Sequence, residues 1–322
     1  MSCSFILKNG IKCKNASKKQ IKDIEYCTRH YNILIQNNDY STISINNILS
    51  ELNINISDII FINKGSFSHV YKILINDKYY ALKIQYLNDN SKNIIYYEYL
   101  LLSQHLNNSD YIVKLYNNNN KKYYYKNNEY AFLLTELLFE TLEEKNQRYK
   151  FNIDEIKFIG IQLIKAIEYI HNQKYLYIDL KPENIMFICE NNNIIKLIDF
   201  NCCSKYINHL SEFYDNSLLK NPIGNMIFSS ININKSYSGI RIDDIESVLW
   251  IILYLLNYEI INNLKKMKKN NKIILAKENF IKNINFEINI HDFIINFINE
   301  LKNYNNINNK KPDYNKFINI LE

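Results

Sequence analysis

The strongest constraint on this chain is a polar loop together with the hairpin that follows it, residues 177–201. The loop carries Asp179, then Lys181 two residues later and Asn184 five residues later, and Asp199 ends the apolar run that follows. Phosphoryl transfer needs such a set of groups. One carboxylate orients the hydroxyl, an ammonium neutralises the transferring group, and an amide oxygen and a second carboxylate hold magnesium. The spacing therefore predicts a phosphoryl-transfer site.

The segments around this loop indicate how the four side chains come together. Residues 154–172 carry apolar residues at a helical period, and Asn172-Gln173 end that helix. Two short strands are expected on either side of residues 191–193. This order of helix, loop and hairpin predicts that the four polar side chains lie at the mouths of adjacent loops and face one cleft.

Composition bounds the class of protein. With 322 residues, of which 47% are apolar or aromatic, the chain can bury a large core and build a two-lobed domain with a small appendage. It is rich in Asn, Ile, Lys and Tyr but has only five glycines and three prolines, a bias typical of the AT-rich genomes of viruses and some protists. The net charge of +6 is spread along the chain, which favours a solvated surface over a dedicated acidic-partner face.

No segment is predicted to be a signal peptide or to span a membrane. Residues 248–256 are apolar but short, which suits a buried helix. The six cysteines indicate a reducing compartment, where metal binding is more common than disulfide formation.

Three of the six cysteines lie in the first 35 residues. Cys3, Cys13, Cys27 and His30 supply three thiolates and one imidazole, a set that suits a closed structural zinc site. So short a segment has almost no core, and bound zinc would supply its folding energy. The alternative is a disordered tail with scattered cysteines. Lysines around the set leave a weak nucleic-acid contact open.

Two segments ahead of the polar loop predict parts of a nucleotide site. Residues 62–72 predict a strand, a turn at Gly65 and a second strand, and Gly65 would let backbone N–H groups approach phosphate. Residues 130–144 predict an apolar strand that leads into the start of a polar helix. In a two-lobed fold, that connection would face the adenine.

Lys83 and Glu98 form a second predicted unit. Lys83 lies between two apolar residues of an alternating strand, where a buried charge needs a partner. Glu98 follows fifteen residues later on a helical pattern. A Lys–Glu pair that holds the α- and β-phosphates is the functional interpretation, and a solvated strand lysine is the alternative.

Together these motifs resemble those of eukaryotic-type protein kinases, and within that class the casein kinase I and vaccinia-related kinase group. Three segments resemble motifs specific to the group. Residues 224–232 resemble its G-T-x-x-[FY]-x-S-I-N segment, residues 241–247 its R-R-D-D-L-E-S helix start, and residues 311–314 its closing K-P-D-Y. The resemblance covers about residues 57–322.

The resemblance implies a role for each matching residue of the catalytic loop. Asp179 would orient the acceptor hydroxyl and serve as base, and Lys181 would contact the γ-phosphate. Asn184 and Asp199 would hold Mg²⁺. Asp244 would brace the loop from the helix below it.

The resemblance also implies an ATP site. Lys83, ordered by Glu98, would hold the α- and β-phosphates. Thr135 would be the gatekeeper. The other implied ATP contacts are the phosphate-loop residues Asn63 and Gly65, the hinge residues Glu136 and Leu138, and the residues that sandwich the base, Ile62, Val70, Ala81 and Met186.

The chain departs from the kinase pattern in several places. Ile178 replaces an Arg that would pair with a phosphorylated activation loop, which predicts constitutive activity. Asn201 replaces a Gly and could bias the magnesium loop. Asn225 replaces a Thr whose hydroxyl would bond the catalytic Asp and Lys, and its amide could take over that bond. The milder departures are Asn63, Ser68 and Tyr177.

The predicted fold class is α+β, a two-lobed protein-kinase fold with a small, mainly antiparallel β lobe that carries one key helix and a large, mainly helical lobe. A small N-terminal zinc-binding segment is predicted in addition. The expected domains are a Cys3His zinc knuckle (1–35), a linker with one short helix (36–56) and a kinase domain (57–322), whose small lobe is 57–138 and large lobe 139–322.

The predicted function is a serine/threonine protein kinase that uses ATP and Mg²⁺ on protein Ser or Thr hydroxyls. A pseudokinase that acts as a scaffold is the main alternative. A small-molecule phosphotransferase shares the Asp and Asn pattern, but the segments at 224–232 and 241–247 argue against it because they shape a peptide-binding face. The expected state is a monomer without membrane contact in the cytoplasm, which would be that of a host cell for a viral protein, with a nuclear or virion location as alternatives.

Overall fold

The computed structural model describes residues 19–21, 24–26, 56–65, 68–87, 93–116, 124–126, 130–208, 210, 212–214, 216–284, 290–304 and 311–322. The chain divides into two compact units. The smaller comprises Met1–Asp58, Leu74–Lys78 and Asn118–Lys122, and the larger comprises Ile59–Ile73, Tyr79–Asn117 and Tyr123–Glu322.

In the smaller unit, two short strands form an antiparallel hairpin, β1 (Lys19–Ile21) and β2 (Ile24–Tyr26). The predicted short helix of the linker lies outside the described residues, as do the predicted zinc ligands Cys3, Cys13, Cys27 and His30.

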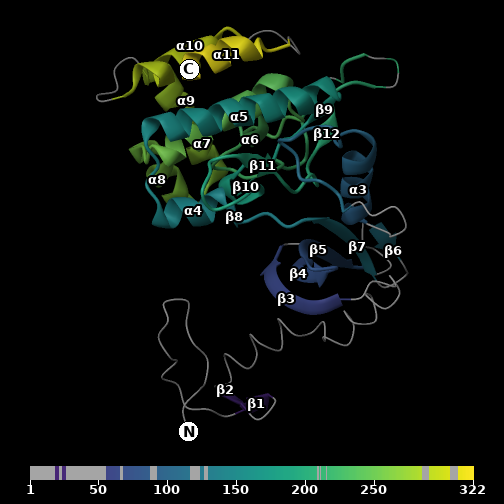
Figure 1. The fold of residues 1–322 in the computed structure, drawn as a ribbon. Helices are drawn as coiled ribbons and strands as arrows, with labels where there is room; N and C mark the ends of the chain where they lie inside the picture. Colours follow the sequence, from purple (N-terminus) through teal and green to yellow (C-terminus); the bar gives the residue numbers. More distant parts are fainter. Residues whose placement is uncertain are drawn as a thin grey trace. The chain divides into compact units, whose positions relative to one another are not determined.

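A five-stranded sheet forms the small lobe, with the strand order β3-β4-β5-β7-β6 (Figure 1). β5 pairs antiparallel with β7, which sets Lys83 opposite Leu133 and Ala81 opposite Thr135. The turn between β4 and β5 uses Asn76 and Asp77 at positive φ, as tight hairpin turns require. The strands are β3 (Ile56–Lys64), β4 (His69–Ile75), β5 (Lys78–Tyr86), β6 (Tyr124–Lys126) and β7 (Tyr130–Glu136).

Helix α3 (Ile94–Gln104) is the one described helix of this lobe. The side chain of Asn93 caps its first turn by accepting from Tyr96 N at 2.9 Å. From β5, Gln85 Oε1 accepts from Ile94 N at 2.9 Å and so ties the start of the helix to the sheet. The buried face of α3 carries Glu98 among apolar residues, so its carboxylate points away from solvent.

The chain crosses to the large lobe after β7. β8 (Glu140–Thr141) pairs with β10, and α4 (Leu142–Arg148) follows at once. Thr141 and Glu144 cap each other's backbone N–H groups at the start of α4, a capping box that fixes where the helix begins.

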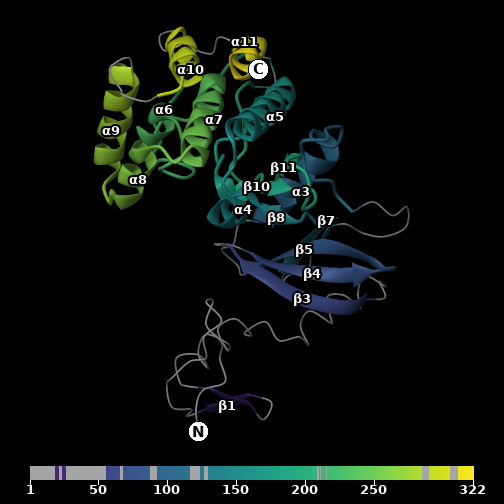
Figure 2. The ribbon, with the colours of Figure 1, turned by 60° about the vertical axis from the view of Figure 1, so that its left-hand side comes forward.

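Helices α5 (Ile153–Asn172) and α7 (Arg241–Leu255) form the centre of the large lobe. They lie side by side in both ribbon views, and α11 (Tyr314–Leu321) packs on α5 (Figures 1 and 2). The remaining elements are β9 (Tyr175–Leu176), β10 (Ile185–Phe187), β11 (Ile195–Leu197), β12 (Ser204–Lys205), α6 (Ile231–Asn234), α8 (Glu259–Lys266), α9 (Asn270–Asn283) and α10 (Asp292–Lys302).

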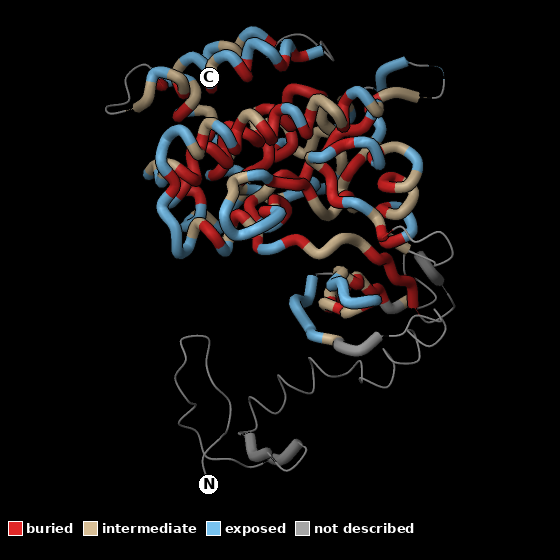
Figure 3. The backbone as a smooth tube through the Cα atoms, viewed as in Figure 1, coloured by how far each residue is buried: buried red, intermediate tan, exposed pale blue. Residues whose placement is uncertain are grey.

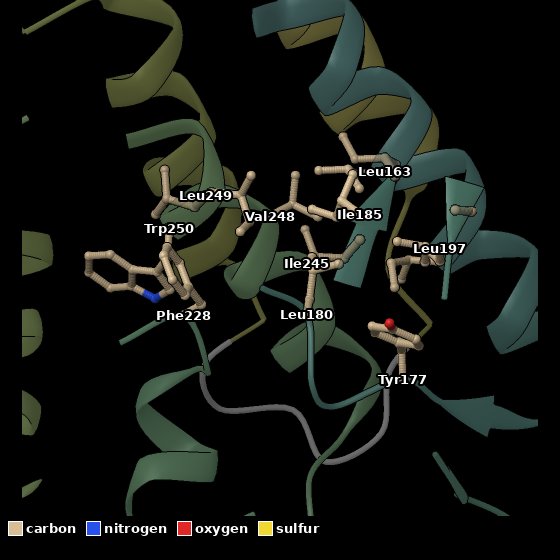
Figure 4. Close-up of a cluster of buried hydrophobic side chains, with 14 of the residues drawn as sticks. Leu163, Tyr177, Leu180, Ile185, Leu197, Phe228, Ile245, Val248, Leu249 and Trp250 are labelled. Atoms are coloured by element: carbon tan, nitrogen blue, oxygen red, sulfur yellow. The ribbon is translucent and has the colours of Figure 1, made fainter. Parts of the chain in front are cut away.

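The apolar core of this lobe reaches the predicted catalytic loop. Figure 3 shows α5 and α7 buried along much of their length. Figure 4 shows Tyr177 and Leu180 of the loop in the same cluster as Ile245 and Val248 of α7. The polar residues between Tyr177 and Asn184 are therefore held on a loop whose apolar side chains are anchored in the core.

The predicted two-lobed α+β fold is confirmed, as are the helices and strands expected around residues 62–72, 130–144, 154–172 and 191–193. Trp250 is fully buried, as expected for a core residue. Within the part of the chain that the structure describes, no helix combines the length and apolar character needed to span a membrane.

Candidate active site

The loop after β9 brings three of the predicted residues together. Lys181 Nζ donates to Asp179 Oδ2 at 2.6 Å. Asn184 Nδ2 donates to Asp179 Oδ2 at 3.1 Å and to the Asp179 carbonyl at 2.9 Å. A 3₁₀ turn over Pro182–Asn184 folds Asn184 back to reach them. Because the amide nitrogen of Asn184 is used inside the loop, its carbonyl oxygen Oδ1 is the atom that could face a metal ion.

Helix α7 braces this loop through one buried carboxylate. Asp244 accepts from the backbone N–H groups of Tyr177 and Ile178, both at 2.8 Å. Ile178 has a φ of 71°, in the left-handed region that β-branched residues avoid, so the two bonds hold a strained backbone. The predicted bracing role of Asp244 is confirmed.

The same carboxylate binds a buried histidine. His171 Nε2 lies 2.9 Å from Asp244 Oδ2, and His171 Nδ1 lies 2.8 Å from the hydroxyl of Tyr314. A neutral imidazole satisfies both contacts, because it donates to the carboxylate and accepts from the phenol. Burial holds the pKa of His171 below its usual value of 6.5, against the attraction of Asp244. His171 is therefore a satisfied core residue and not a catalytic one.

A second cluster joins the two lobes of the site. Lys83 Nζ lies 2.7 Å from Glu98 Oε2 and 3.2 Å from Asp199 Oδ1. The predicted Lys83–Glu98 pair is thus present. Burial alone would lower the pKa of Lys83, but the charges of Glu98 and Asp199 hold it above its usual range. Lys83 is a permanent cation at the base of the site.

The two aspartates differ in electrostatic environment. Burial raises the pKa of Asp179, although Lys181 opposes the shift. Burial would also raise the pKa of Asp199, but the charges of Lys83 and Lys181 outweigh it and hold that pKa below its usual range. Asp199 is therefore ionised and more than a third exposed at its side chain, which suits a metal ligand. Asp179, with the higher pKa, suits a group that receives a proton.

Asn184 and Asp199 fit a divalent cation of the magnesium type. Both present oxygen atoms, and Asp199 Oδ2 is not the atom that contacts Lys83. Hard cations such as Mg²⁺ prefer oxygen ligands and keep several waters, so two protein ligands are sufficient. Among the described residues, no cluster of three or more His, Cys, Asp or Glu side chains could hold a metal by itself.

The connection between the lobes leaves backbone groups free for a planar base. Glu136 N donates to Lys114 O at 2.9 Å, and its carboxylate pairs with Lys196 and accepts from Lys114 N. This ties Glu136 away from the cleft. In the described part of the chain, the N–H of Leu138 donates to no protein acceptor. Leu138 N–H is therefore available to a ligand.

The other predicted ATP contacts lie on the strands that flank this connection. Ile62, Val70 and Ala81 are on β3, β4 and β5, and Met186 is on β10. At the phosphate turn, Gly65 N donates to Ser68 O at 2.8 Å, and Asn63 Oδ1 accepts from Lys64 N at 2.8 Å. In the described residues, no hydrogen bond joins this turn to the clusters at Asp179 and Lys83.

The segment 224–232 lies directly on the catalytic loop. Gly224 has a φ of 78°, and a Cβ there would lie 3.1 Å from Ile178 O and 3.4 Å from Asp179 Oδ1. Only glycine combines this conformation with so close an approach. The side chain of Asn225 was expected to reach the catalytic residues. Instead, its Oδ1 accepts from Ile227 N at 2.9 Å and from Phe228 N at 3.3 Å, because an Asn side chain closes such a local turn readily.

Asp243, the neighbour of Asp244, holds this segment, and sequence reasoning did not assign it a role. Its carboxylate accepts from Ser230 Oγ at 2.8 Å, from Asn232 Nδ2 at 2.8 Å and from Ile240 N at 2.7 Å. Burial raises its pKa to about 7, although the three donors oppose the shift. The only sequence signal was its place in the Asp243-Asp244 pair.

Arg241 anchors the stretch between the magnesium loop and the segment 224–232. Its guanidinium lies 4.9 Å from the ring centre of Tyr206 and 5.3 Å from that of Phe213. The two rings stack on each other, and Tyr206 OH donates to His171 O at 2.7 Å. These contacts hold the stretch by cation–π attraction and stacking, which no sequence motif had indicated.

The cysteines beside the magnesium loop are not activated. Burial raises the pKa of Cys202 to about 11 and that of Cys203 well above its usual range. A thiol reacts as its thiolate, so neither suits a nucleophile or a redox sensor. Their small size explains their place in the packing.

Comparisons with known proteins agree with this geometry. The family model described as "Protein kinase domain" matches residues 58–308. A protein described as "Probable casein kinase I homolog", from Encephalitozoon cuniculi, is 30% identical over 203 residues, which cover 60% of this chain and 60% of that protein. A "Probable serine/threonine-protein kinase" from Dictyostelium discoideum is 26% identical over 199 residues, 60% of this chain and 39% of that protein.

A solved structure is similar as well. "Structure of vaccinia related kinase 3" superposes with a TM-score of 0.69 at 14% identity, over 83% of this chain and 89% of that one. At this identity the likeness concerns the fold. The matched region spans 60% and 39% of the lengths of the two curated relatives.

Proposed function

The chain belongs to the protein kinase family, and on that premise we propose that it is an active serine/threonine kinase that transfers the γ-phosphoryl group of ATP to protein hydroxyls. The observation that carries the proposal is the complete charged set in one site. Lys83 contacts both Glu98 and Asp199, while Lys181 and Asn184 both contact Asp179.

Each residue of this set has a proposed task in the transfer. Asp179 accepts the hydrogen bond of the acceptor Ser or Thr hydroxyl and receives its proton as the new oxygen–phosphorus bond forms. The bond from the γ-phosphorus to its bridging oxygen breaks, and ADP leaves. Lys181 sits beside Asp179 and neutralises charge on the transferring group. Mg²⁺, held by Asn184 and Asp199, would supply charge neutralisation at the phosphates when bound.

The remaining residues position the nucleotide. Lys83, fixed by Glu98, holds the α- and β-phosphates, and the Asn63–Gly65 turn covers them. Leu138 offers its backbone N–H to the adenine beside Thr135, whereas the N–H of Glu136 already donates to Lys114 O. Apolar residues sandwich the base from both lobes, namely Ile62, Val70, Ala81 and Met186.

Constitutive activity is part of the proposal. Ile178 stands where an Arg would pair with a phosphorylated loop. The stretch that such a phosphate would order is instead anchored by Arg241 between Tyr206 and Phe213. This supports a site that is ordered without loop phosphorylation.

An experiment on acceptor labelling tests the activity. Purified chain with Mg-ATP and casein should label casein. Asp179→Asn should label it roughly 10²- to 10⁴-fold more slowly, the usual range for a lost general base. Asp110→Asn is the matched control, since Asp110 is an exposed residue paired with Lys114, and it should keep wild-type labelling. Equal labelling by wild type and Asp179→Asn would favour the alternative, a pseudokinase that serves as a scaffold.

A second experiment tests whether the activity is independent of phosphorylation of the activation loop. Phosphatase-treated protein should be as active as untreated protein, and Arg241→Met should lose activity that no added upstream kinase restores. A gain of activity on phosphorylation of residues 202–223 would contradict this part of the proposal.

Further parts of the proposal concern the N-terminal segment and the source, oligomeric state and location of the protein. A Cys3-Cys13-Cys27-His30 zinc site is supported by the ligand types and their spacing, and its basic surroundings support a weak nucleic-acid contact. Metal analysis of the full chain and of a Cys27→Ser variant tests it, with about one zinc expected only in the former. We propose a viral source, with which the richness in Asn, Ile, Lys and Tyr agrees, although some protists share this bias. A monomeric state in the cytoplasm, with a nuclear or virion location as alternatives, completes the proposal.

A further inference from the structure

Helix α9 carries a lysine that is completely buried. Lys277 has none of its surface exposed, although lysine is among the residues least often buried. It lies on the apolar stripe of α9, between Ile273 four residues earlier and Phe280 three residues later, both buried. At this place a leucine or methionine would pack without burying a charge.

The ammonium of Lys277 meets three oxygen atoms of one segment. Lys277 Nζ donates to Ser229 O at 2.5 Å, to Met226 O at 3.1 Å and to Asn234 Oδ1 at 2.9 Å. An ammonium has three N–H donors, so all three are satisfied. Two of the acceptors are backbone carbonyls, which means that Lys277 recognises the shape of the segment rather than a particular side chain.

The neighbouring helix offsets part of the cost of burying Lys277. Burial lowers the pKa of Lys277 to about 7, although the charge of Glu246 opposes the shift. Its Nζ lies 4.7 Å from the ring centre of Trp250. Glu246 of α7 is its electrostatic partner, and Glu246 Oε1 in turn accepts from Ile231 N at 2.9 Å and from Trp250 Nε1 at 3.0 Å. Lys277 of α9 and Glu246 of α7 therefore both form hydrogen bonds with the segment 226–234.

The segment gripped in this way continues into the site. Gly224 lies so close to the catalytic loop that an added Cβ would be 3.1 Å from Ile178 O and 3.4 Å from Asp179 Oδ1, and Met226 follows two residues later. Asn234 is tied again, since its Nδ2 donates to Met226 O at 3.1 Å and its carbonyl accepts from Asn270 Nδ2 at 2.6 Å. Burying a cation costs more than burying an apolar side chain, so packing stability does not explain Lys277.

We propose that Lys277 is a positioning residue that fixes residues 226–234 in the shape that receives the protein acceptor beside Asp179. This inference rests on the proposed kinase function for its kinetic consequence, but the hold on the segment does not depend on activity. Among the described residues, the hydrogen-bond partners of Lys277 include neither the ATP-site residues nor the catalytic loop. Its effect should therefore fall on the acceptor and not on the nucleotide.

The test replaces the cation by an apolar side chain of similar length. Lys277→Met should raise the KM for casein, with kcat/KM for casein lower by roughly tenfold or more, because hydrogen bonds to a charged group are lost. The KM for ATP should change less than about twofold. Lys272→Met, an exposed lysine on the same helix, is the matched control and should leave all constants unchanged. Equal changes in the KM for ATP and for casein would indicate a general structural role and overturn the inference.

A measurement without catalysis separates this inference from the proposed function. Amide hydrogen exchange in residues 226–234 should be faster in Lys277→Met than in wild type, while exchange in α5 should be unchanged. An inactive wild type with this exchange pattern would sink the kinase proposal and leave the positioning role intact. If Lys277→Met is active and has wild-type exchange and a wild-type KM for casein, the positioning role is refuted and the kinase proposal stands.

A second variant covers the case in which Lys277→Met does not fold. Asn234→Ala removes one of the three acceptors and the bond to Met226 O. It should give the same pattern with a smaller rise in the KM for casein. Unchanged exchange and unchanged KM in Asn234→Ala would then count against the inference.

Discussion

Asp243 and Asp244 are consecutive residues of α7, and each holds a different loop of the active site. Asp244 accepts from the backbone of Tyr177 and Ile178 in the catalytic loop. Asp243 accepts from Ser230 and Asn232 in the segment 224–232. Both loops are hydrogen-bonded to one turn of one buried helix. The geometry of α7 therefore sets the distance between the two loops.

The two aspartates should therefore separate into two kinetic classes when each is replaced. Asp244→Asn puts an amide nitrogen opposite a backbone N–H and should lower kcat, because the catalytic loop loses its brace. Asp243→Asn should mainly raise the KM for the protein acceptor. Each variant leaves a buried donor unsatisfied and should cost roughly 1–3 kcal/mol of unfolding free energy. Steady-state kinetics with urea unfolding checks both, and identical kinetic changes would contradict the division.

Lys83 and Glu98 should behave as one unit in a double-mutant cycle. Lys83→Met should lower kcat/KM for ATP by roughly a hundredfold, on the order found for the loss of one preorganised donor. Glu98→Gln should lower it by less, since Asp199 still contacts Lys83. The double variant should be no worse than Lys83→Met alone. Lys114→Met, which breaks the exposed pair with Asp110, is the control. Additive losses would show that the two act independently.

Gly224 should not tolerate a side chain. Its φ of 78° costs a non-glycine residue about 1–2 kcal/mol, and an added Cβ would lie 3.0 Å from Ser229 Oγ. Gly224→Ala should lose at least that unfolding free energy and also lose activity, because the methyl group presses on the carbonyl of Ile178. Gly65→Ala is the stability control, since its φ lies outside the left-handed region and the nearest atom would be 3.5 Å away. Similar unfolding free energies for both variants would refute this account.

His171 should make the fold sensitive to acid. Burial holds its pKa below the usual value of 6.5, so on acidification the unfolded chain takes up a proton before the folded chain does. This contribution is fully present above about pH 6.5 and is lost as the pH falls towards the folded-state pKa, at up to about 1.4 kcal/mol per pH unit.

Urea unfolding between pH 5 and pH 7.5 measures that sensitivity. His171→Gln should flatten the acid side of the stability curve, since glutamine does not titrate. His291→Gln, at the start of α10, is the matched control and should keep the wild-type curve. If His171→Gln keeps the wild-type slope, the histidine is not the group responsible.

The sequence predicted those features that depend on periodicity and on short spacings. Alternation around Lys83 and the helical pattern around Glu98 suggested their pairing, with a solvated lysine as the alternative, and the structure shows the pair. The polar loop at Asp179 needed only the chain order of helix, loop and hairpin. Each of these contacts lies along one element or between neighbouring ones.

The features that were missed depend on which loops a helix meets in space. Lys277 on α9 and Asp243 on α7 bind residues that are 48 and 13 positions away, and periodicity shows which face of a helix is buried but not what covers it. A lysine within the apolar stripe of α9 was a usable signal that an oxygen-rich partner existed. Asn225 was misjudged because its side chain can close its own turn, a local choice that competes with any distant partner.

The anchoring of Arg241 by two rings also bears on how the protein responds to salt. An arginine that holds a phosphate at the surface is screened by dissolved ions, because the Debye length is only about 8 Å at physiological ionic strength. Arg241 is buried and lies against Tyr206, which is also buried, and against Phe213, so its attraction to the rings is screened less than that of a surface arginine. The order of this stretch should therefore depend less on ionic strength than it would if a surface arginine–phosphate pair held it.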